Sequence, residues 1–222
     1  NLDHAGAIDF ILKRLRETQP EVEIVAAGHR VVHGRLAYDR AVRVDGSVLE
    51  ALAKFIPLAP LHQPHNLAGI RAAAAADPNL PQMACFDTAF HRGKPLAAEI
   101  FALPRAMTEA GIHRYGFHGL SYEYIARRLP SARPGARRVV VAHLGNGASM
   151  AAMVGRKCLG TTLGFSTIDG LMMGTRCGNL DPGVVLHLME TKGLGVKEMT
   201  KMLYKESGLL GVSGISPDTV SY

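Results

Sequence analysis

Apolar side chains recur every three or four positions in several stretches of the chain, and this spacing predicts amphipathic helices. The first stretch is 7–16, which Pro20 terminates. The same spacing, together with capping residues, predicts further helices over 47–55, 65–76, 121–129, 182–192 and 196–204, and helical turns around 95–110. Ser47 and Glu50 form a capping box for the helix over 47–55, and Gly208 is expected to end the last helix.

Short runs of apolar and β-branched residues, bounded by glycine or proline, predict strands. These runs are 21–27, 82–86, 138–143 and 149–154. The run at 138–143 has the pattern of a buried strand, and the glycine turns after it predict a β-meander over 138–162. Asp45-Gly46 is expected to form a hairpin-type turn. Because helices and strands are mixed without a regular order, the sequence predicts an α/β protein, with a domain junction near 88–96.

Composition excludes several classes of protein. The 222 residues are 47% hydrophobic and 20% charged, as is usual for a globular chain. No apolar stretch approaches the ~20 residues of a membrane helix, and the first ten residues lack a signal-peptide pattern. The net charge of +6 is scattered, which argues against nucleic-acid binding. Three widely spaced cysteines indicate neither a disulfide framework nor a zinc site, so reduced thiols in the cytoplasm are expected.

A glycine-rich turn joins the last two predicted strands, with the sequence His143-Leu144-Gly145-Asn146-Gly147. Two glycines two residues apart can leave backbone N–H groups open to phosphate oxygens, and Asn146 adds an amide donor. Asn-Gly is equally typical of a plain hairpin turn, and this segment alone leaves that alternative open. The nucleotide-binding patterns GxxxxGK[ST] and GxGxxG are both absent from the sequence.

Charged residues follow two of the predicted strands. Arg30 lies between glycines, where its guanidinium could bind a carboxylate or phosphate, or could simply be an exposed arginine of a turn. Asp87 directly follows the strand at 82–86, a common position for a catalytic or Mg²⁺-associated carboxylate, although it could instead cap the next turn. His29 and His33 are four residues apart, but the glycine and valines around them disfavour the helix that a zinc pair would need.

Three more polar side chains lie in glycine- or proline-rich loops. They are His118, between two glycines, Arg176, in the loop at 164–178, and His62, in the loop at 57–64. Each could be structural, and a buried, hydrogen-bonded histidine is the alternative for His118. Taken together, two arginines, an aspartate, several histidines and a glycine turn suit phosphoryl transfer, in which positive groups surround the transferred phosphoryl group.

Seven segments, in order along the chain, resemble the acetate kinase family of acyl-phosphate-forming kinases. They are GHRVVHG at 28–34, APLHQPHN at 59–66, CFDTAFH at 85–91, RYGFHGLS at 114–121, HLGNGAS at 143–149, GFSTIDGLMMGTRCGNLDPG at 164–183 and ESGLLGVSGIS at 206–216. The resemblance implies an actin/hexokinase-like fold of two ribonuclease-H-like domains, here residues 1–90 and 91–222, incomplete at both termini. It also implies reversible, in-line transfer of the ATP γ-phosphate to acetate, giving ADP and acetyl phosphate. Mg²⁺ would be required, the enzyme would be a cytoplasmic homodimer, and neither nucleic acid nor a membrane would be a partner.

The resemblance further implies roles for the matching residues. Asp87, His118 and Arg176 match the catalytic groups, and Arg30 and His62 match the substrate-binding groups. The ATP phosphates are expected at the segment His143, Leu144, Gly145, Asn146 and Gly147, with Asp218 on the adenosine side. No set of protein metal ligands is implied.

The chain departs from the family pattern at several positions. Arg35-Leu36 stand where Gly-Glu is usual, Tyr122 stands where a second histidine is usual, and Asn179 replaces an aspartate. Family members are longer, so the chain is expected to be an internal part of such a kinase. A non-catalytic anion-binding module and a metal-dependent hydrolase are the alternative functions, and acetate, propionate and butyrate are equally compatible with the sequence.

Overall fold

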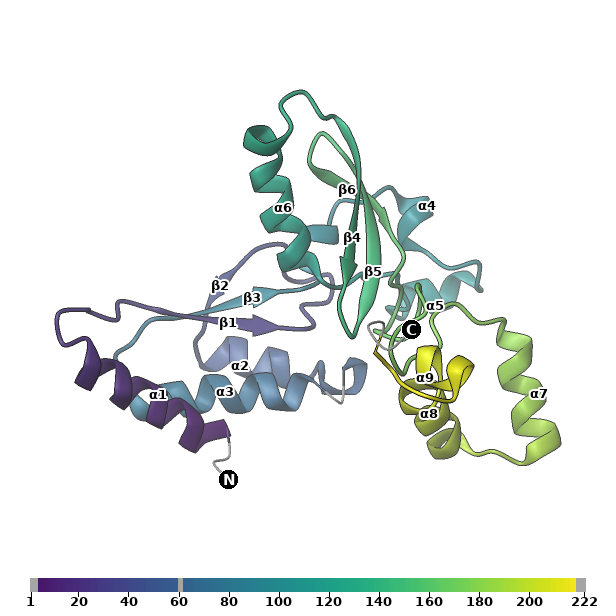
Figure 1. Cartoon of the computed structure of the whole chain (residues 1–222), viewed down its shortest axis with the longest axis horizontal. Coiled ribbons are helices and arrows are strands. Elements are labelled where there is room, and N and C mark those ends of the chain that lie inside the picture. Colours follow the sequence, from purple (N-terminus) through teal and green to yellow (C-terminus); the bar gives the residue numbers. More distant parts are fainter. Residues whose placement is uncertain (1–3, 60–61, 219–222) are drawn as a thin grey trace. The chain divides into compact units, whose positions relative to one another are not determined.

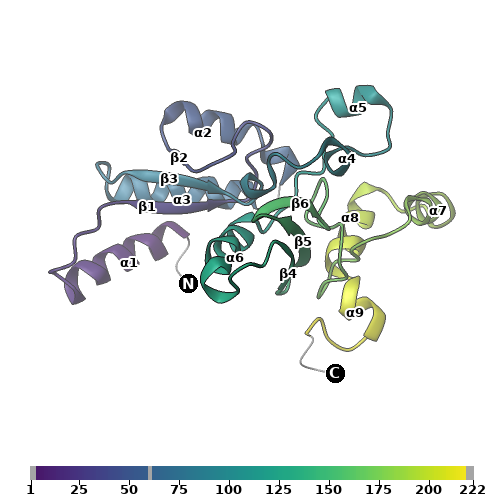
Figure 2. The same cartoon turned by 90° about the horizontal axis from the view of Figure 1, so that it is seen from above.

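A computed structural model describes residues 4–59 and 62–218 of the chain. The chain divides into two compact units, Asn1–Arg92 and Gly93–Tyr222. Each unit has its own three-stranded sheet, with the strand order β1-β3-β2 in the first and β4-β5-β6 in the second (Figure 1, Figure 2). The mixture of helices and strands confirms the expected α/β class. Among the described residues, no helix is long and apolar enough to cross a membrane.

The first unit is a small sheet covered by helices. Its elements are α1 (His4–Thr18), β1 (Ala27–Val31), β2 (Val42–Arg43), α2 (Gly46–Ala53), α3 (Gln63–Ala76) and β3 (Gln82–Phe86). The central strand β3 runs parallel to β1 and antiparallel to β2. Both α1 and α2 pack against α3, which in turn packs against β1 (Figure 1). The core is built from Val31, Leu52, Phe55, Leu67, Ile70, Ala84 and Phe86.

Three local predictions for this unit are wrong. The strand expected over 21–27 lies at Ala27–Val31, because only that segment pairs with β3, while Val22 and Val25 are 52% and 71% exposed. Asp45 belongs to no hairpin turn. Its carboxylate caps α2 by accepting the Val48 N–H at 2.8 Å, and Ser47, the expected cap, donates its hydroxyl to the same carboxylate. An aspartate two residues earlier thus replaces the predicted capping box.

The second unit contains the predicted meander and six helices among its described residues. Its elements are α4 (Leu96–Glu99), α5 (Arg105–Glu109), α6 (Gly119–Ala132), β4 (Arg138–Leu144), β5 (Ala148–Val154), β6 (Lys157–Thr161), α7 (Pro182–Lys192), α8 (Val196–Lys205) and α9 (Gly208–Ser213). Consecutive strands pair antiparallel, which confirms the meander. Helix α6 packs against β4 (Figure 1).

The structure corrects two expectations for this unit. Strand β4 is not buried on both faces, because its residues alternate and every second one, including Val140 and Leu144, is exposed. Gly208 does not end α8. It begins α9 at a φ of +66°, where an added Cβ would overlap the carbonyl oxygen of Met173. Glycine at this position allows α9 to approach the loop that carries Arg176.

Candidate active site

Arg30 and Asp87 meet at one edge of the first sheet. Arg30 lies near the carboxyl end of β1, opposite Cys85, and Asp87 is the first residue after β3. Because the two strands are parallel, their carboxyl ends share one edge. Arg30 Nη2 donates to Asp87 Oδ2 at 2.6 Å, and Nε lies 3.1 and 3.2 Å from the two carboxylate oxygens. The carboxylate is 2% exposed and the guanidinium side chain 56% exposed, and their hydrogen bond raises the pKa of Arg30.

This pairing bears on the two alternatives for Asp87. The short helical turn after β3, Ala89–His91, has Thr88 at its N-cap position, and the Thr88 side chain makes no capping hydrogen bond. The Asp87 carboxylate holds the guanidinium of Arg30.

The chain that follows Arg30 is fixed by neighbouring side chains. Asn66 Oδ1 accepts the Val32 N–H at 3.0 Å, and Thr88 Oγ1 accepts the Gly34 N–H at 3.1 Å. The buried Gln63 donates to the carbonyl oxygen of His33. His33 is itself fully buried, and burial, aided by the nearby charge of Arg35, lowers its pKa to about 4.

His62 occupies the N-cap position of α3, where its carbonyl oxygen accepts the Asn66 N–H at 3.0 Å. It shares this helix start with Gln63, which holds the segment after Arg30. The assignment of His62 to the substrate stays a prediction.

A second group of candidate residues surrounds Gly147, in the turn between β4 and β5. A Cβ at Gly147 would lie 3.4 Å from His118 Nε2 and 3.6 Å from Arg176 Nη1, so both side chains come close to this glycine. Arg176 Nη1 also donates to the Thr167 carbonyl at 3.0 Å, and burial lowers the pKa of Arg176. Two candidate side chains and the candidate phosphate turn therefore lie together within the second unit.

His118 is held in an unusual backbone conformation. It is the N-cap residue of α6, with a φ of +59°, a left-handed value that is uncommon for residues other than glycine. Its Nδ1 lies 2.8 Å from Ser149 Oγ, and its ring stacks on that of His143 with centroids 4.1 Å apart. Such a residue is kept in place only where its surroundings determine its position strongly.

Sequence reasoning did not select the serines that contact these two histidines. Ser149 is fully buried in β5, and Ser121 lies 3.0 Å from His143 Nδ1. A signal was present, since Ser149, Ala151 and Met153 share the inward-facing register of β5 and only the serine is polar. A buried hydroxyl in an apolar row requires a hydrogen-bond partner, and His118 is one of the two partners of Ser149.

The segment at 145–147 forms the turn of the β4–β5 hairpin, as the simpler interpretation of Asn-Gly expected. The Gly145 N–H donates to the Gly147 carbonyl at 3.2 Å, so this N–H is used within the turn. The expectation that both glycines present open N–H groups is therefore wrong for Gly145.

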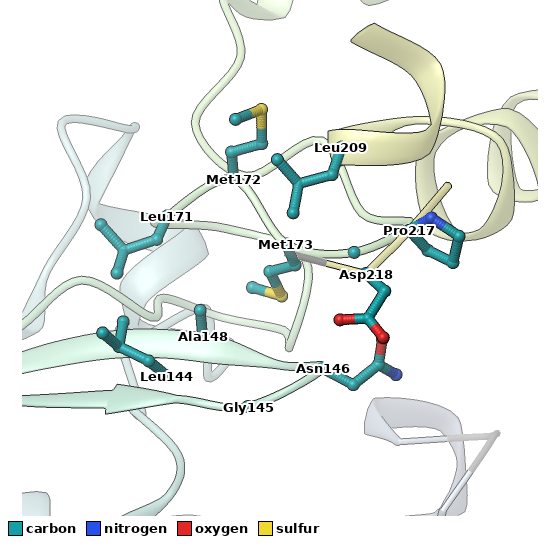
Figure 3. A pocket seen from close by; sticks show the side chains of 11 residues that line it. Leu144, Gly145, Asn146, Ala148, Leu171, Met172, Met173, Leu209, Pro217 and Asp218 are labelled. Atoms are coloured by element: carbon teal, nitrogen blue, oxygen red, sulfur yellow. The ribbon is translucent and has the colours of Figure 1, made fainter. Parts of the chain in front are cut away.

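The same turn lines a pocket of about 750 Å³, a size typical of small-molecule sites. Leu144 and Ala148 line it from the hairpin, while Leu171, Met172, Met173 and Leu209 line it from the facing segments (Figure 3). Asn146 and Asp218 are the amide and carboxylate of the lining. The candidate nucleotide residues Leu144, Gly145, Asn146 and Asp218 therefore face a single pocket.

A family model and curated relatives match nearly the whole chain. The model of the acetokinase family matches residues 1–221. The chain belongs to the acetokinase family. It is 56% identical over 218 residues to the acetate kinase of Rhodopseudomonas palustris, covering 97% of this chain and 55% of that protein.

Solved structures of the acetokinase family share the fold of this chain. The propionate kinase of Francisella tularensis superposes with a TM-score of 0.94 at 38% identity, covering all of this chain and 58% of that one. The Porphyromonas gingivalis acetate kinase gives a TM-score of 0.87 at 40% identity, covering 97% and 56% of the two chains. This agrees with the expected actin/hexokinase-like fold. The chain spans about half the length of the acetokinase relatives that it matches.

Proposed function

We propose that this chain forms part of a kinase that transfers the γ-phosphate of ATP to a short-chain carboxylate, acetate in the first place. The observation that carries the proposal is the approach of His118 Nε2 and Arg176 Nη1 to Gly147. Hydrogen-bond donors and positive charge aimed at one small volume are what a transferred phosphoryl group needs. Membership of the acetokinase family supports a carboxylate as the acceptor.

In this proposal, Arg30 binds the substrate carboxylate and Asp87 orients Arg30. The hydrogen bonds to Asp87 use Nε and one Nη2 hydrogen of a guanidinium that has five N–H donors. The remaining donors of the half-exposed side chain can bind a second carboxylate. The negative charge of Asp87 thereby acts on the substrate through Arg30, because it fixes the plane of the guanidinium group.

The transfer would be a direct displacement. An oxygen of the substrate carboxylate forms a bond to the γ-phosphorus while the bond from that phosphorus to the bridging oxygen of ADP breaks, and ADP leaves with the electron pair. A carboxylate is already a nucleophile at neutral pH, so no strong base is required. His118 and Arg176 would stabilise charge on the transferred group, and positioning together with electrostatics would supply the rate enhancement.

The pocket beside the Gly147 turn would hold the nucleoside. Its leucine and methionine side chains suit a flat apolar base, and Asp218 and Asn146 suit hydroxyl and amine groups. His143 and the backbone of the hairpin turn would lie on the phosphate side. His62 would contact the carboxylate substrate.

The described side chains fit Mg²⁺ only if the phosphates of ATP supply most of its ligands. Within the described part of the chain, no cluster of three or more histidine, cysteine, aspartate or glutamate side chains could hold a metal ion. Proteins often bind Mg²⁺ through one or two carboxylates together with substrate phosphates. Asp87 is the candidate carboxylate, and the ion would neutralise phosphate charge there.

Three further assignments belong to the same proposal. The two compact units would be parts of two ribonuclease-H-like domains, residues 1–90 and 91–222. The enzyme would be a homodimer, which light scattering of the purified protein tests. The cytoplasm would be its location.

A chimaera tests the activity. This chain replaces the matching 55% of the Rhodopseudomonas palustris acetate kinase, and ATP-dependent acyl phosphate is trapped with hydroxylamine in the presence of acetate, propionate or butyrate. We expect turnover with at least one of these carboxylates. A folded chimaera that binds phosphate but forms no acyl phosphate would instead indicate a non-catalytic anion-binding module.

A further inference from the structure

Two buried hydroxyl groups form a hydrogen-bonded chain that ends on His118. Ser149 Oγ lies 2.8 Å from His118 Nδ1, and the hydroxyl of Tyr122 hydrogen-bonds to the same Ser149 oxygen. Tyr122 and Ser149 are both 0% exposed. Buried hydroxyl groups keep their partners because an unmade hydrogen bond in the interior is costly.

The acidity of the two hydroxyl groups favours one direction for this chain. The phenol of Tyr122 is more acidic than the aliphatic hydroxyl of Ser149, so Tyr122 is the better donor. With the tyrosine proton donated to Ser149 Oγ, the serine proton is directed to His118 Nδ1. A neutral imidazole whose Nδ1 accepts a hydrogen bond carries its proton on Nε2.

His118 Nε2 is the ring atom that approaches the Gly147 turn, 3.4 Å from the position that a Cβ there would take. A proton on this nitrogen makes it a donor toward an anion at the turn. The opposite tautomer would present a lone pair to the same anion and would repel it. Whether Nδ1, on the far side of the ring, is protonated therefore determines whether Nε2 presents an N–H group or a lone pair to the turn.

We propose that Tyr122 and Ser149 are positioning residues that orient the His118 ring and keep its Nε2–H directed at the Gly147 turn. The consequence for phosphoryl transfer rests on the proposed function, whereas the tautomer itself does not. Neither residue would touch the substrate, and both would act through His118.

A parallel contact on the neighbouring ring provides an internal control. His143 Nδ1 lies 3.0 Å from Ser121 Oγ, although the two histidine rings are stacked on each other. Removing one serine should change one histidine and not the other. Tyr124, on the same helix as Tyr122 and 62% exposed, provides the matched tyrosine control.

The test is nitrogen NMR of the histidine rings in the ¹⁵N-labelled 222-residue chain, near pH 8, above the usual histidine pKa of about 6.5. His118→Gln identifies the His118 signals, and the exposed His187 serves as the reference ring. We expect the two His118 nitrogens to be farther apart in shift than those of His187, with the proton on Nε2. In Ser149→Ala the separation should fall toward the His187 value, and in Tyr122→Phe it should fall by a smaller amount.

The controls separate positioning from a general loss of structure. Tyr124→Phe should leave His118 unchanged, and Ser121→Ala should alter His143 alone. Ser149→Thr retains the hydroxyl and should retain the wild-type His118 signals. If Ser149→Ala does not fold, Tyr122→Phe and Ser149→Thr decide. The proposal is overturned if His118 of the wild type carries its proton on Nδ1. It is also overturned if the His118 shifts do not respond to Ser149→Ala or, where that variant does not fold, to Tyr122→Phe.

A kinetic measurement in the chimaera distinguishes the two proposals. Ser149→Ala should lower kcat by about tenfold, less than the 10²–10³ expected when an entire charge-stabilising donor is lost, with the KM for acetate nearly unchanged. If the nitrogen shifts respond as expected but kcat does not, the positioning of His118 stands and its proposed part in phosphoryl transfer fails.

Discussion

Acidification should destabilise the first unit through His33. This side chain is fully buried after β1, and its Nδ1 accepts the backbone N–H of Arg35 at 3.0 Å. Burial and the charge of Arg35 lower its pKa from 6.5 to about 4. The folded chain therefore holds His33 neutral over a pH range in which the unfolded chain would protonate it.

The sign and size of the effect follow from this difference in pKa. Because the folded pKa lies below the unfolded one, the unfolded state binds more protons and stability is lost as pH falls from about 6.5 toward 4. A difference of about 2.5 pKa units corresponds to at most about 3.4 kcal/mol, at 1.36 kcal/mol per unit. Most of that amount should be lost between about pH 7 and pH 4.

Urea unfolding at several pH values measures the effect, and His33→Gln isolates it from the titration of carboxylates. Glutamine does not titrate, and its amide oxygen can accept the Arg35 N–H. His187→Gln, at an exposed position of α7, is the control variant. Between pH 7 and pH 4, the free energy of unfolding should fall by about 3 kcal/mol less in His33→Gln than in the wild type. It should fall by the wild-type amount in His187→Gln. Equal losses in all three proteins would refute the assignment.

Three further predictions concern the site and the thiols. In the chimaera, Asp87→Asn should lower turnover by orders of magnitude with an unchanged circular dichroism spectrum, and near-normal turnover would contradict its part in orienting Arg30. Arg176→Ala should lower kcat by about 10²–10³, whereas Arg30→Ala should mainly raise the KM for acetate, and the reverse pattern would show the two roles to be exchanged. Burial raises the pKa of Cys158 to about 11, so at pH 8 a thiol reagent should modify it far more slowly in the native than in the denatured chain, and equal rates would contradict its burial.

The spacing of apolar residues correctly predicted those elements whose type is determined by their own sequence. The helix over 182–192, with Asp181 as its cap and Pro182 in its first turn, and the meander over 138–162 are present as expected. These segments carry their own caps and turns, so their type does not depend on distant contacts.

The sequence-based predictions are wrong where contacts between distant segments determine the local structure. The strand at 27–31 contains Gly28, His29 and Arg30, which a propensity argument assigns to a turn, and it is a strand because it pairs with β3 more than fifty residues later. The run at 138–143 has the same composition whether one or both faces are covered, so sequence could not show that Val140 would be exposed.

The pairing of Arg30 with Asp87 was also beyond local pattern, although both residues were candidates. Each was recognised as a charged residue near a strand end, but only the parallel register of β1 and β3 makes them neighbours. The same limit applied to Tyr122, which was noted only for replacing a histidine. Its relation to Ser149 required the α6–β5 packing that brings their hydroxyl groups together.

The two groups of candidate residues follow the same physical rule. A polar side chain buried in an apolar row is destabilising unless it has a partner, so its presence implies one. Asp87 is such a residue at the end of β3, and its partner is the half-exposed Arg30. Ser149 is such a residue in β5, and its partner is His118, whose other nitrogen faces the Gly147 turn. In each case the buried member fixes a side chain that is less buried than itself. The buried polar positions of this fold therefore position candidate functional side chains that lie one hydrogen bond farther outward.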